Sequence, residues 1–573
     1  MSKRIDPSSD EDPNLSQEKP ENGLKGLRHW RHDLLAGVVV SLVSLPLSSG
    51  IAVASGAPPI YGLISAIIAG LIYPALGGSY VTISGPAAGL APALVGIMAA
   101  LGGVGDANTV GAGYYRLLVV ICLVGIIQIV IARTGLAKYA SVFPASVVEG
   151  MLAAIGVLIL VKAIPLAFGV VESGHPHGFV EYVTHIPNWF SAGVPSAMVI
   201  GGTTLSVMLF ASSKPARKFK LFRMMPPHLW GVAVAVPLGF VLGLRAINPH
   251  LLIEVPANPL SGIHLPAFAE VFGDSSLWGA TFVGVVTLLL IDGVESLATA
   301  QAIDRVDPYK RTSNPDRVLL AMGVSNLVSS LVGGLTVIPG GVKSKTNIEA
   351  GGRTLWSNSV NATMLLIFLF VAPGIISTIP MAALGGILIY TGWKMAHPSI
   401  AKHVAHIGIE QLLLYFVTLI VTLLTDLLIG VAAGTACKFL LLLYNAQIQS
   451  SLSQGRLTTR EILRGMFRDP VTESTSEDGE TTLKIEGSLV CFNAFRLREH
   501  VAHLGKETRR VCIEITEKAA IVDHTACEAV FAVASAQGTH DISLQGLDEM
   551  ASLGPDKESL RLQRESRLSR VAG

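Results

Sequence analysis

The chain is dominated by apolar runs that are each long enough to cross a lipid bilayer. Between Leu34 and Tyr444, stretches of about 17–25 mostly apolar residues follow one another with short polar connections. Charged residues make up only 14% of the chain, against about a quarter in a typical soluble domain. We therefore expect an all-α polytopic membrane protein. The expected segments number about fourteen: 34–54, 60–77, 86–101, 116–133, 146–167, 194–212, 228–245, 279–302, 317–332, 342–350, 357–372, 375–392, 409–427 and 428–446.

Positive charge alternates between successive loops. Lys25, Arg28 and Arg31 precede the first segment, and Lys or Arg also follows the sixth, eighth, tenth and twelfth segments. The intervening loops 171–193, 247–278 and 333–341 contain neither residue type. Because positive loops stay on the cytoplasmic side, this alternation predicts a multi-pass protein of the cell (inner) membrane with both termini cytoplasmic.

Fourteen segments divide into two sets of seven, and an odd number per set places the second set upside down relative to the first. The third segment of each set is short or interrupted. A helix start carries free N–H groups and partial positive charge, so it favours an anion. Paired interruptions in corresponding positions are typical of a transporter's substrate site. We therefore predict a 7+7 inverted repeat with its site at the two interruptions.

The residues of the two interruptions are the candidate anion-binding residues. They are Ser84, Gly85, Pro86 and Ala87 in the first, and Gly340, Gly341, Val342 and Lys343 in the second. Pro86 is expected at the first helical position, where its missing N–H costs nothing. The alternative for the first interruption is an ordinary tight turn. For Lys343, and for Lys345 beside it, the alternative is a side chain that reaches to the membrane interface.

The eighth segment carries two carboxylates at membrane depth. Asp292 and Glu295 are three residues apart and are expected to share one helix face, with Thr299 one turn beyond Glu295. Such a face could bind Na⁺ through oxygen ligands or carry a proton on a buried carboxyl group. The alternative is a structural pairing of either carboxylate with Lys343.

The first segment contains a Pro-Leu-Ser-Ser sequence. Pro46 should interrupt the helix and free a backbone carbonyl, which Ser48 and Ser49 could satisfy unless they line a cavity. A simple packing kink explains the same residues equally well.

Several other functions are not indicated. Net charge is near zero, so nothing suggests a nucleic-acid partner, and no enzyme constellation or cofactor motif is present. The cysteines have no metal-ligand spacing and are expected to be free thiols; they are Cys122, Cys437, Cys491, Cys512 and Cys527.

Composition divides the chain into five regions. Residues 1–29 are expected to be a disordered cytoplasmic tail, 30–446 the transmembrane domain, 447–480 a linker, 481–554 a small α/β domain and 555–573 a charged tail. Within the α/β domain we expect two strands in 482–492, a helix at 494–504, a strand at 510–515, a helix at 526–537 and a strand at 541–544.

Three stretches resemble the SulP family of inorganic anion transporters with a C-terminal STAS domain. They lie at 45–63, 83–87 and 347–354. The resemblance implies core and gate domains, elevator-like movement, a homodimer and an anion between the starts of the third and tenth helices. It also implies a coupling carboxylate at Glu295 and a Na⁺-assisting hydroxyl at Thr299.

The sequence departs from the family at the pocket. Gly340 and Gly341 stand where relatives often have Ser or Thr, Lys343 where an arginine is common, and Ile51 where the first helix often has an aromatic residue. In the tail, Asp523 and Thr525 match the STAS loop, and Thr525 occupies a position where related domains carry a phosphorylatable residue.

The sequence therefore predicts a secondary active transporter of sulfate or bicarbonate, coupled to Na⁺ or H⁺. The alternatives are a nucleobase or dicarboxylate permease of the same fold, an uncoupled anion channel, and a non-transporting sensor that signals through a cytoplasmic partner of its STAS domain.

Overall fold

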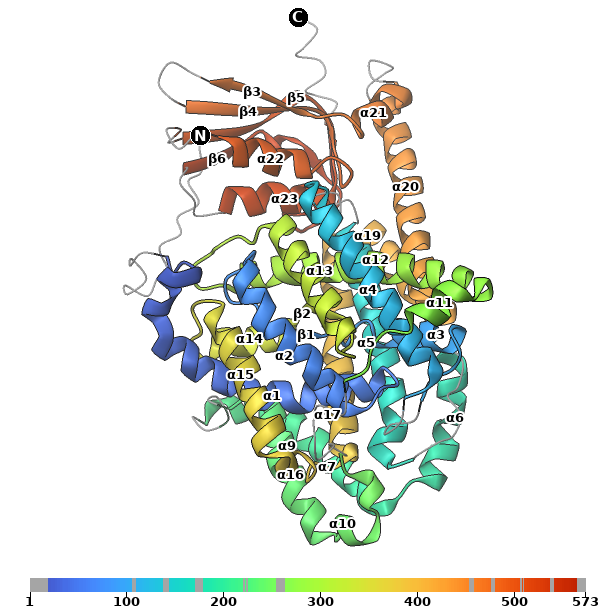
Figure 1. Cartoon of the computed structure of the whole chain (residues 1–573). Helices are drawn as coiled ribbons and strands as arrows, with labels where there is room; N and C mark the ends of the chain where they lie inside the picture. The colour runs from blue at the N-terminus through green and yellow to red at the C-terminus, as the bar shows by residue number, and fades with distance from the viewer. Residues whose placement is uncertain are drawn as a thin grey trace, which may run out of the picture.

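The computed structural model describes residues 19–105, 110–137, 144–170, 179–219, 222, 225–253, 263–452, 458–475, 480–504, 508, 510–535 and 541–563. A large helical body carries a smaller domain of strands and helices at one end (Figure 1). Of the tail expected over 1–29, residues 1–18 lie outside the described residues. The rest contains the 3₁₀ helix η1 (Gly23–His29).

Every predicted apolar segment contains a helix. Seven of the described helices are long and apolar enough to cross a membrane, and shorter helices supply the other segments. The segment helices are α1 (Trp30–Ala54), α2 (Pro59–Leu76), α3 (Ala91–Ala100), α4 (Ala112–Arg133), α5 (Ala145–Phe168), α7 (Pro195–Ser212), α9 (Pro227–Val241), α12 (Trp278–Val306), α13 (Pro315–Leu331), α14 (Gly341–Glu349), α15 (Trp356–Val371), α17 (Met381–Met395), α19 (Ile409–Leu424) and α20 (Leu427–Leu452).

Further helices lie in the connections between these segments. The described ones are α6 (Phe179–Ala192), α10 (Leu244–Ile247), α11 (Phe268–Gly273), α16 (Pro373–Ile376) and α18 (Pro398–Ile407). Helix α6 lies within the loop 171–193, for which the sequence predicted no helix.

The helix contacts repeat when the first seven segments are exchanged with the last seven. The contact of α4 with α13 corresponds to that of α15 with α2, and the pair α7–α9 corresponds to α19–α20. Likewise α5–α19 corresponds to α17–α7, while α5–α17 maps onto itself. This symmetry is the 7+7 repeat predicted from the sequence. Helices α1–α4 and α12–α15 form one body, the core, and α5, α7, α9, α17, α19 and α20 form a second, the gate.

Two short strands join the halves inside the core. Strand β1 (Ser84–Pro86) pairs antiparallel with β2 (Val337–Pro339), with Gly85 opposite Ile338. The sequence interpretation had no strands here. It also placed Pro86 at a helix start, whereas Pro86 ends β1 and α3 begins at Ala91. The second interruption does lead directly into a helix, since α14 begins at Gly341.

The C-terminal domain is an α/β domain, as predicted. Its elements are α21 (Thr459–Gly465), β3 (Val471–Thr475), β4 (Glu480–Leu489), α22 (Phe495–His503), β5 (Arg510–Val522), α23 (His524–Ser535), β6 (Asp541–Gln545), β7 (Ala551–Ser552) and β8 (Arg561–Leu562). The sheet runs β3-β4-β5-β8-β7, and β6 also pairs with β5. Strands β4, β5 and β6 are parallel, and α22 and α23 pack on the sheet through apolar side chains.

Three expected boundaries in this domain need correction. Residues 482–492 hold most of one strand, β4, rather than two. The expected linker 447–480 contains α21 and β3, and the expected charged tail supplies β8. The tail was misread because the Arg561 side chain is buried, where its guanidinium donates to the carbonyls of Leu547 (3.2 Å) and Lys557 (3.0 Å).

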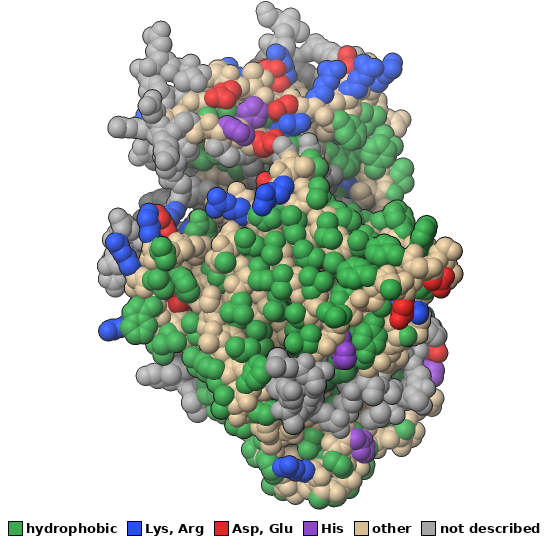
Figure 2. All heavy atoms as spheres, in the orientation of Figure 1, with side chains coloured by type: hydrophobic (Ala, Val, Ile, Leu, Met, Phe, Trp, Pro, Cys, Tyr) green, Lys and Arg blue, Asp and Glu red, His purple; other side chains and the backbone are tan. Residues whose placement is uncertain are grey.

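The N-terminal region and the basic loops after the eighth and tenth segments, predicted to share one side of the membrane, are bonded to one another. Arg311 donates to the carbonyls of Pro20 and Arg353, both at 2.8 Å, and the Arg353 N–H donates to Asp33 at 2.7 Å. Figure 2 shows basic side chains in a row beneath the upper domain, above a broad hydrophobic surface. The C-terminal domain lies on this side of the molecule.

Candidate functional site

The two interruptions meet because backbone bonds connect them. The Gly340 N–H donates to the Ile83 carbonyl at 2.7 Å, and the Ile83 N–H donates to the Ser344 hydroxyl at 2.9 Å. The β1–β2 pair continues this contact for three residues on each side. The third and tenth segments are therefore fixed to each other, and the start of α14 lies beside β1.

Lys343 is the charged group at this junction. Its side chain is 2% exposed, and its Nζ donates to the Ser48 hydroxyl at 2.8 Å. A Cβ added at Gly85 would lie 2.5 Å from that Nζ, so the ammonium lies directly over β1. An ammonium has three donors, and a buried charge at membrane depth is costly unless it is paired. Lys343 is thus buried rather than interfacial, whereas Lys345 is exposed.

The remaining residues of the two interruptions differ in solvent exposure. Ser84, Gly85, Pro86 and Ala87 are buried, and the Ser84 hydroxyl accepts a bond from Asn358 Nδ2 at 2.9 Å. At the start of α14, Gly341 is exposed, and Gly340 and Val342 are half-buried. The accessible backbone of this junction therefore comes from α14.

Glu295 and Thr299 lie at the same junction. Glu295 is 6% exposed, and its Oε2 is buried with no hydrogen-bond partner among the described residues. A Cβ added at Gly89, in the turn before α3, would collide with the Glu295 carboxylate. A Cβ at Gly341 would lie 3.7 Å from Thr299 Cγ2. One face of α12 therefore presents a carboxylate to the α3 side and a hydroxyl-bearing residue to the α14 side.

Asp292, on the same helix, differs from Glu295 because both of its carboxylate oxygens are bonded. Its carboxylate accepts bonds from Asn326 Nδ2 (2.9 Å), Thr336 Oγ1 (2.9 Å) and Ser296 Oγ (3.1 Å). Asp292 holds α12 against α13 and the residues before β2.

The structural pairing considered for Lys343 is also absent from the described part of the chain. There, no ion pair within 4 Å joins Lys343 to Asp292 or Glu295.

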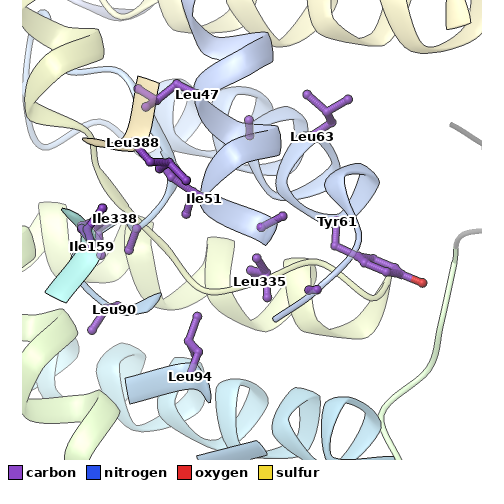
Figure 3. Packing of buried hydrophobic residues seen from close by; sticks show 14 of the residues in the cluster. Leu47, Ile51, Tyr61, Leu63, Leu90, Leu94, Ile159, Leu335, Ile338 and Leu388 are labelled. Atoms are coloured by element: carbon purple, nitrogen blue, oxygen red, sulfur yellow. The ribbon is translucent and has the colours of Figure 1, made fainter. Parts of the chain in front are cut away.

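The first segment contributes Ser48 but is not interrupted. Helix α1 runs continuously through Pro46. The Ser48 hydroxyl lies 3.4 Å from that of Ser44 and accepts the Lys343 bond, and Ser49 Oγ is buried without a partner among the described residues. Ile51 is 3% exposed and belongs to the main apolar cluster. Figure 3 shows its side chain near Leu388 of α17, so Ile51 packs at the contact between core and gate.

The loop that contains Asp523 and Thr525 is docked on the gate. Asp523 Oδ2 pairs with Lys438 of α20 at 3.2 Å and accepts the Cys491 N–H at 3.0 Å, while Oδ1 accepts the Ala526 N–H at 2.8 Å. The Thr525 hydroxyl accepts the N–H of Ala145, the first residue of α5, at 3.3 Å. These residues connect the C-terminal domain to two gate helices.

Lys438 was missed in the sequence interpretation. The available signal was a single lysine inside the apolar segment 428–446, which is as unusual at membrane depth as Lys343. Gly89 was also missed, because its closeness to Glu295 depends on packing between segments far apart in the chain.

The cysteines are free, as expected. Burial raises the pKa of the Cys527 thiol to about 12 and also raises that of Cys491, so neither forms a thiolate readily. No group of three or more His, Cys, Asp or Glu residues suited to a metal ion occurs in the described ranges.

Known proteins are similar to this chain in sequence and in fold. Residues 30–418 match the Sulfate permease family. The bicarbonate transporter BicA of Picosynechococcus sp. is 26% identical over 412 residues, covering 71% of this chain and 69% of its own length. The putative sulfate transporter YvdB of Bacillus subtilis is 27% identical over 426 residues, covering 72% and 73%.

Two solved structures have the same fold. The transmembrane domain of a cyanobacterium bicarbonate transporter, BicA, has a TM-score of 0.58 at 22% identity and covers 71% of this chain and 97% of its own. The structure of SLC26A9 has a TM-score of 0.63 at 15% identity and covers 90% and 84%. Because the family match spans well over half of the sequence, the chain belongs to the sulfate permease family of membrane anion transporters.

Proposed function

We propose that the chain is a secondary active transporter of a small inorganic oxyanion, sulfate or bicarbonate. The observation that carries this is the Lys343 ammonium, buried at the junction of the two repeats and bonded to the neutral Ser48 hydroxyl. An anion beside it would gain a charge-assisted bond and the positive end of α14 in place of its hydration. The names of relatives, a bicarbonate transporter and a putative sulfate transporter, support this substrate class.

The coupling ion would bind at Glu295. Its unpartnered carboxylate oxygen is available to a proton or to Na⁺, and Thr299 on the next turn could supply a further oxygen. A cation there would offset negative charge in a site that also takes an anion. Binding of one ion would thus favour binding of the other, which is the basis of symport.

Alternating access would arise from movement of the core against the gate. Ser48, Glu295, Thr299 and Lys343 all belong to core helices, so the site can move as one unit. The contact between the bodies includes Ile51 of the core and Ile159 and Leu388 of the gate, within one apolar cluster (Figure 3). Apolar surfaces can slide without breaking directional bonds, which favours an elevator-type motion.

The proposal also covers the oligomeric state, the membrane orientation and the C-terminal domain. We infer a homodimer in the inner membrane with both termini cytoplasmic, and a STAS-type C-terminal domain. In that domain Thr525 would report the state of the gate to a cytoplasmic partner, because its hydroxyl contacts α5.

Uptake into proteoliposomes tests the proposal directly. Labelled sulfate, bicarbonate, fumarate and uracil are each supplied with a Na⁺ gradient, a proton gradient or no gradient. Gradient-driven accumulation of sulfate or bicarbonate is the expected result. Accumulation of fumarate or uracil alone would identify a different permease, absence of flux would favour a sensor, and currents without a cation gradient would identify a channel.

Replacement of Glu295 by glutamine is expected to remove stimulation of uptake by the cation gradient while leaving the protein folded. Glutamine keeps the size of the side chain but neither binds a proton at neutral pH nor carries the charge that attracts Na⁺. The measurement is initial uptake with and without the gradient. Glu349→Gln, at an exposed position on α14, is the matched control. Undiminished gradient-dependent uptake in Glu295→Gln would show that Glu295 does not bind the coupling ion.

Replacement of Gly85 by alanine is expected to weaken anion uptake, because the new Cβ would lie 2.5 Å from Lys343 Nζ and displace the ammonium. Gly96→Ala is the control, since a Cβ there meets no atom within 4 Å. Substrate titration of initial uptake should show a raised apparent KM for Gly85→Ala and an unchanged value for Gly96→Ala. Equal values would show that the ammonium position does not determine affinity.

A further inference from the structure

An apolar crevice opens between the core and the gate on the side of the C-terminal domain. Its volume is about 510 Å³, and its walls come from α12 of the core and from α5 and α20 of the gate. Leu290 and Val294 line one wall, and Leu428 and Phe439 line the other. Phe467 and Phe492 of the C-terminal domain, stacked with ring centroids 5.5 Å apart, line it as well.

The crevice has the depth of one membrane leaflet. Its lining on α20 extends from Leu428 to Phe439, and these twelve residues span about 17 Å at about 1.5 Å per residue. Half of the hydrocarbon thickness of a bilayer is about 15 Å. Phe439 follows Lys438, which is paired with Asp523, so this end of the crevice meets the C-terminal domain.

Basic side chains lie at that end. A second hollow shares Phe467 with the crevice and is lined by Arg460, Leu463 and Arg464. Arg460, Leu463 and Arg464 have the i, i+3, i+4 spacing of one face of α21, and Phe467 lies in the turn that follows the helix. Both arginines are exposed, and neither has an ion-pair partner within 4 Å among the described residues. Glu461 between them instead accepts bonds from Thr458 in a capping box.

We propose that this crevice binds one anionic phospholipid from the leaflet on the side of the C-terminal domain. An acyl chain would lie along α20 between the two bodies, and the headgroup phosphate would contact Arg460 and Arg464. A guanidinium matches the geometry of phosphate, and a leaflet-deep apolar channel with a basic mouth matches a lipid of this charge. The walls of the crevice come from α12, from α20 and from Phe467 and Phe492, so the lipid would contact the core, the gate and the C-terminal domain together.

Tryptophan quenching in the full chain tests this proposal without requiring transport. Phe467 is 66% exposed, so Phe467→Trp places a reporter at the mouth without disturbing the interior. The protein is reconstituted in phosphatidylcholine vesicles that contain equal small fractions of brominated phosphatidylglycerol or brominated phosphatidylcholine. Quenching of the added tryptophan, taken relative to the unmodified chain, is expected to be at least twofold greater with the brominated phosphatidylglycerol.

Three further double substitutions, each combined with Phe467→Trp, locate the binding. Adding Arg460→Gln and Arg464→Gln to the Phe467→Trp chain should remove the preference for the phosphatidylglycerol headgroup. The control adds Arg217→Gln and Lys218→Gln, in a basic turn elsewhere, and should retain that preference. Adding Ala432→Phe and Ala436→Phe, which fill the crevice, should reduce quenching by the brominated phosphatidylglycerol although both arginines remain. Equal quenching by the two lipids, or a headgroup preference that survives the loss of both arginines, would overturn the proposal.

Discussion

Replacement of Lys343 by methionine is expected to weaken anion uptake at low substrate concentration by roughly 10- to 150-fold. A hydrogen bond to a charged group contributes about 1.5–3 kcal/mol. Each 1.4 kcal/mol or so of lost binding free energy weakens binding about tenfold. The ammonium lies at the β1–β2 junction, with its Nζ over Gly85. Methionine has a similar length and fills the same space without charge. The measurement is initial uptake of sulfate and bicarbonate over a range of concentrations.

Folding should survive this substitution. Lys343 is bonded to a hydroxyl and forms no ion pair in the described part of the chain, so its removal leaves no buried counter-charge behind. Ser48 keeps a neighbour in Ser44, 3.4 Å away. Lys345→Met removes a lysine from the same helix at an exposed position and should leave uptake unchanged. A monodisperse Lys343→Met protein with normal uptake would exclude an anion site at this ammonium.

The sequence predicted the membrane fold well because its signals are local. An apolar run long enough to span a bilayer is visible without any knowledge of its neighbours, and basic loops alternate with loops that lack Lys and Arg. The corresponding positions of the third and tenth segments followed from simple counting. The structure then brought these two segments together through β1 and β2.

The details of the site depend on contacts that no local pattern reports. Ser48 and Lys343 are 295 residues apart, and their bond exists only after α1 packs against α14. Asp292 and Glu295 looked alike in the sequence because each is a carboxylate in an apolar helix. They differ because Asn326 and Thr336, from other segments, surround only Asp292. Helix periodicity alone could not have supplied those partners.

Charge was misread where the C-terminal domain meets its neighbours. The charged stretch 555–573 suggested an exposed tail, but its Arg561 is buried within β8, which pairs with β7, and Lys438 was not noticed within an apolar segment. Both side chains are buried because the protein supplies acceptors for them: carbonyls for Arg561 and the Asp523 carboxylate for Lys438. Burial of a charge is predictable only when its partner is known.

Replacement of Lys438 by methionine is expected to destabilise the attachment of the C-terminal domain by about 3–5 kcal/mol, the range for removal of one partner of a buried ion pair. Asp523 would remain buried with a full charge, and its other bonds come from the backbone N–H groups of Cys491 and Ala526. The expected results are a lower apparent melting temperature of the purified protein and faster hydrogen exchange around Asp523 and the facing residues of α20.

A second substitution separates the uncompensated charge from simple loss of packing. Lys438→Met combined with Asp523→Asn removes both charges and keeps an acceptor for the Ala526 N–H, so part of the stability should return. Lys518→Met is the control, because the Lys518–Glu486 pair is largely exposed and such pairs contribute about 0–1 kcal/mol. Equal melting temperatures for Lys438→Met and Lys518→Met would show that the ion pair does not hold the domain. Partial recovery in the double variant would show that the buried Asp523 charge requires Lys438, which is the contact that joins this loop to α20 of the gate.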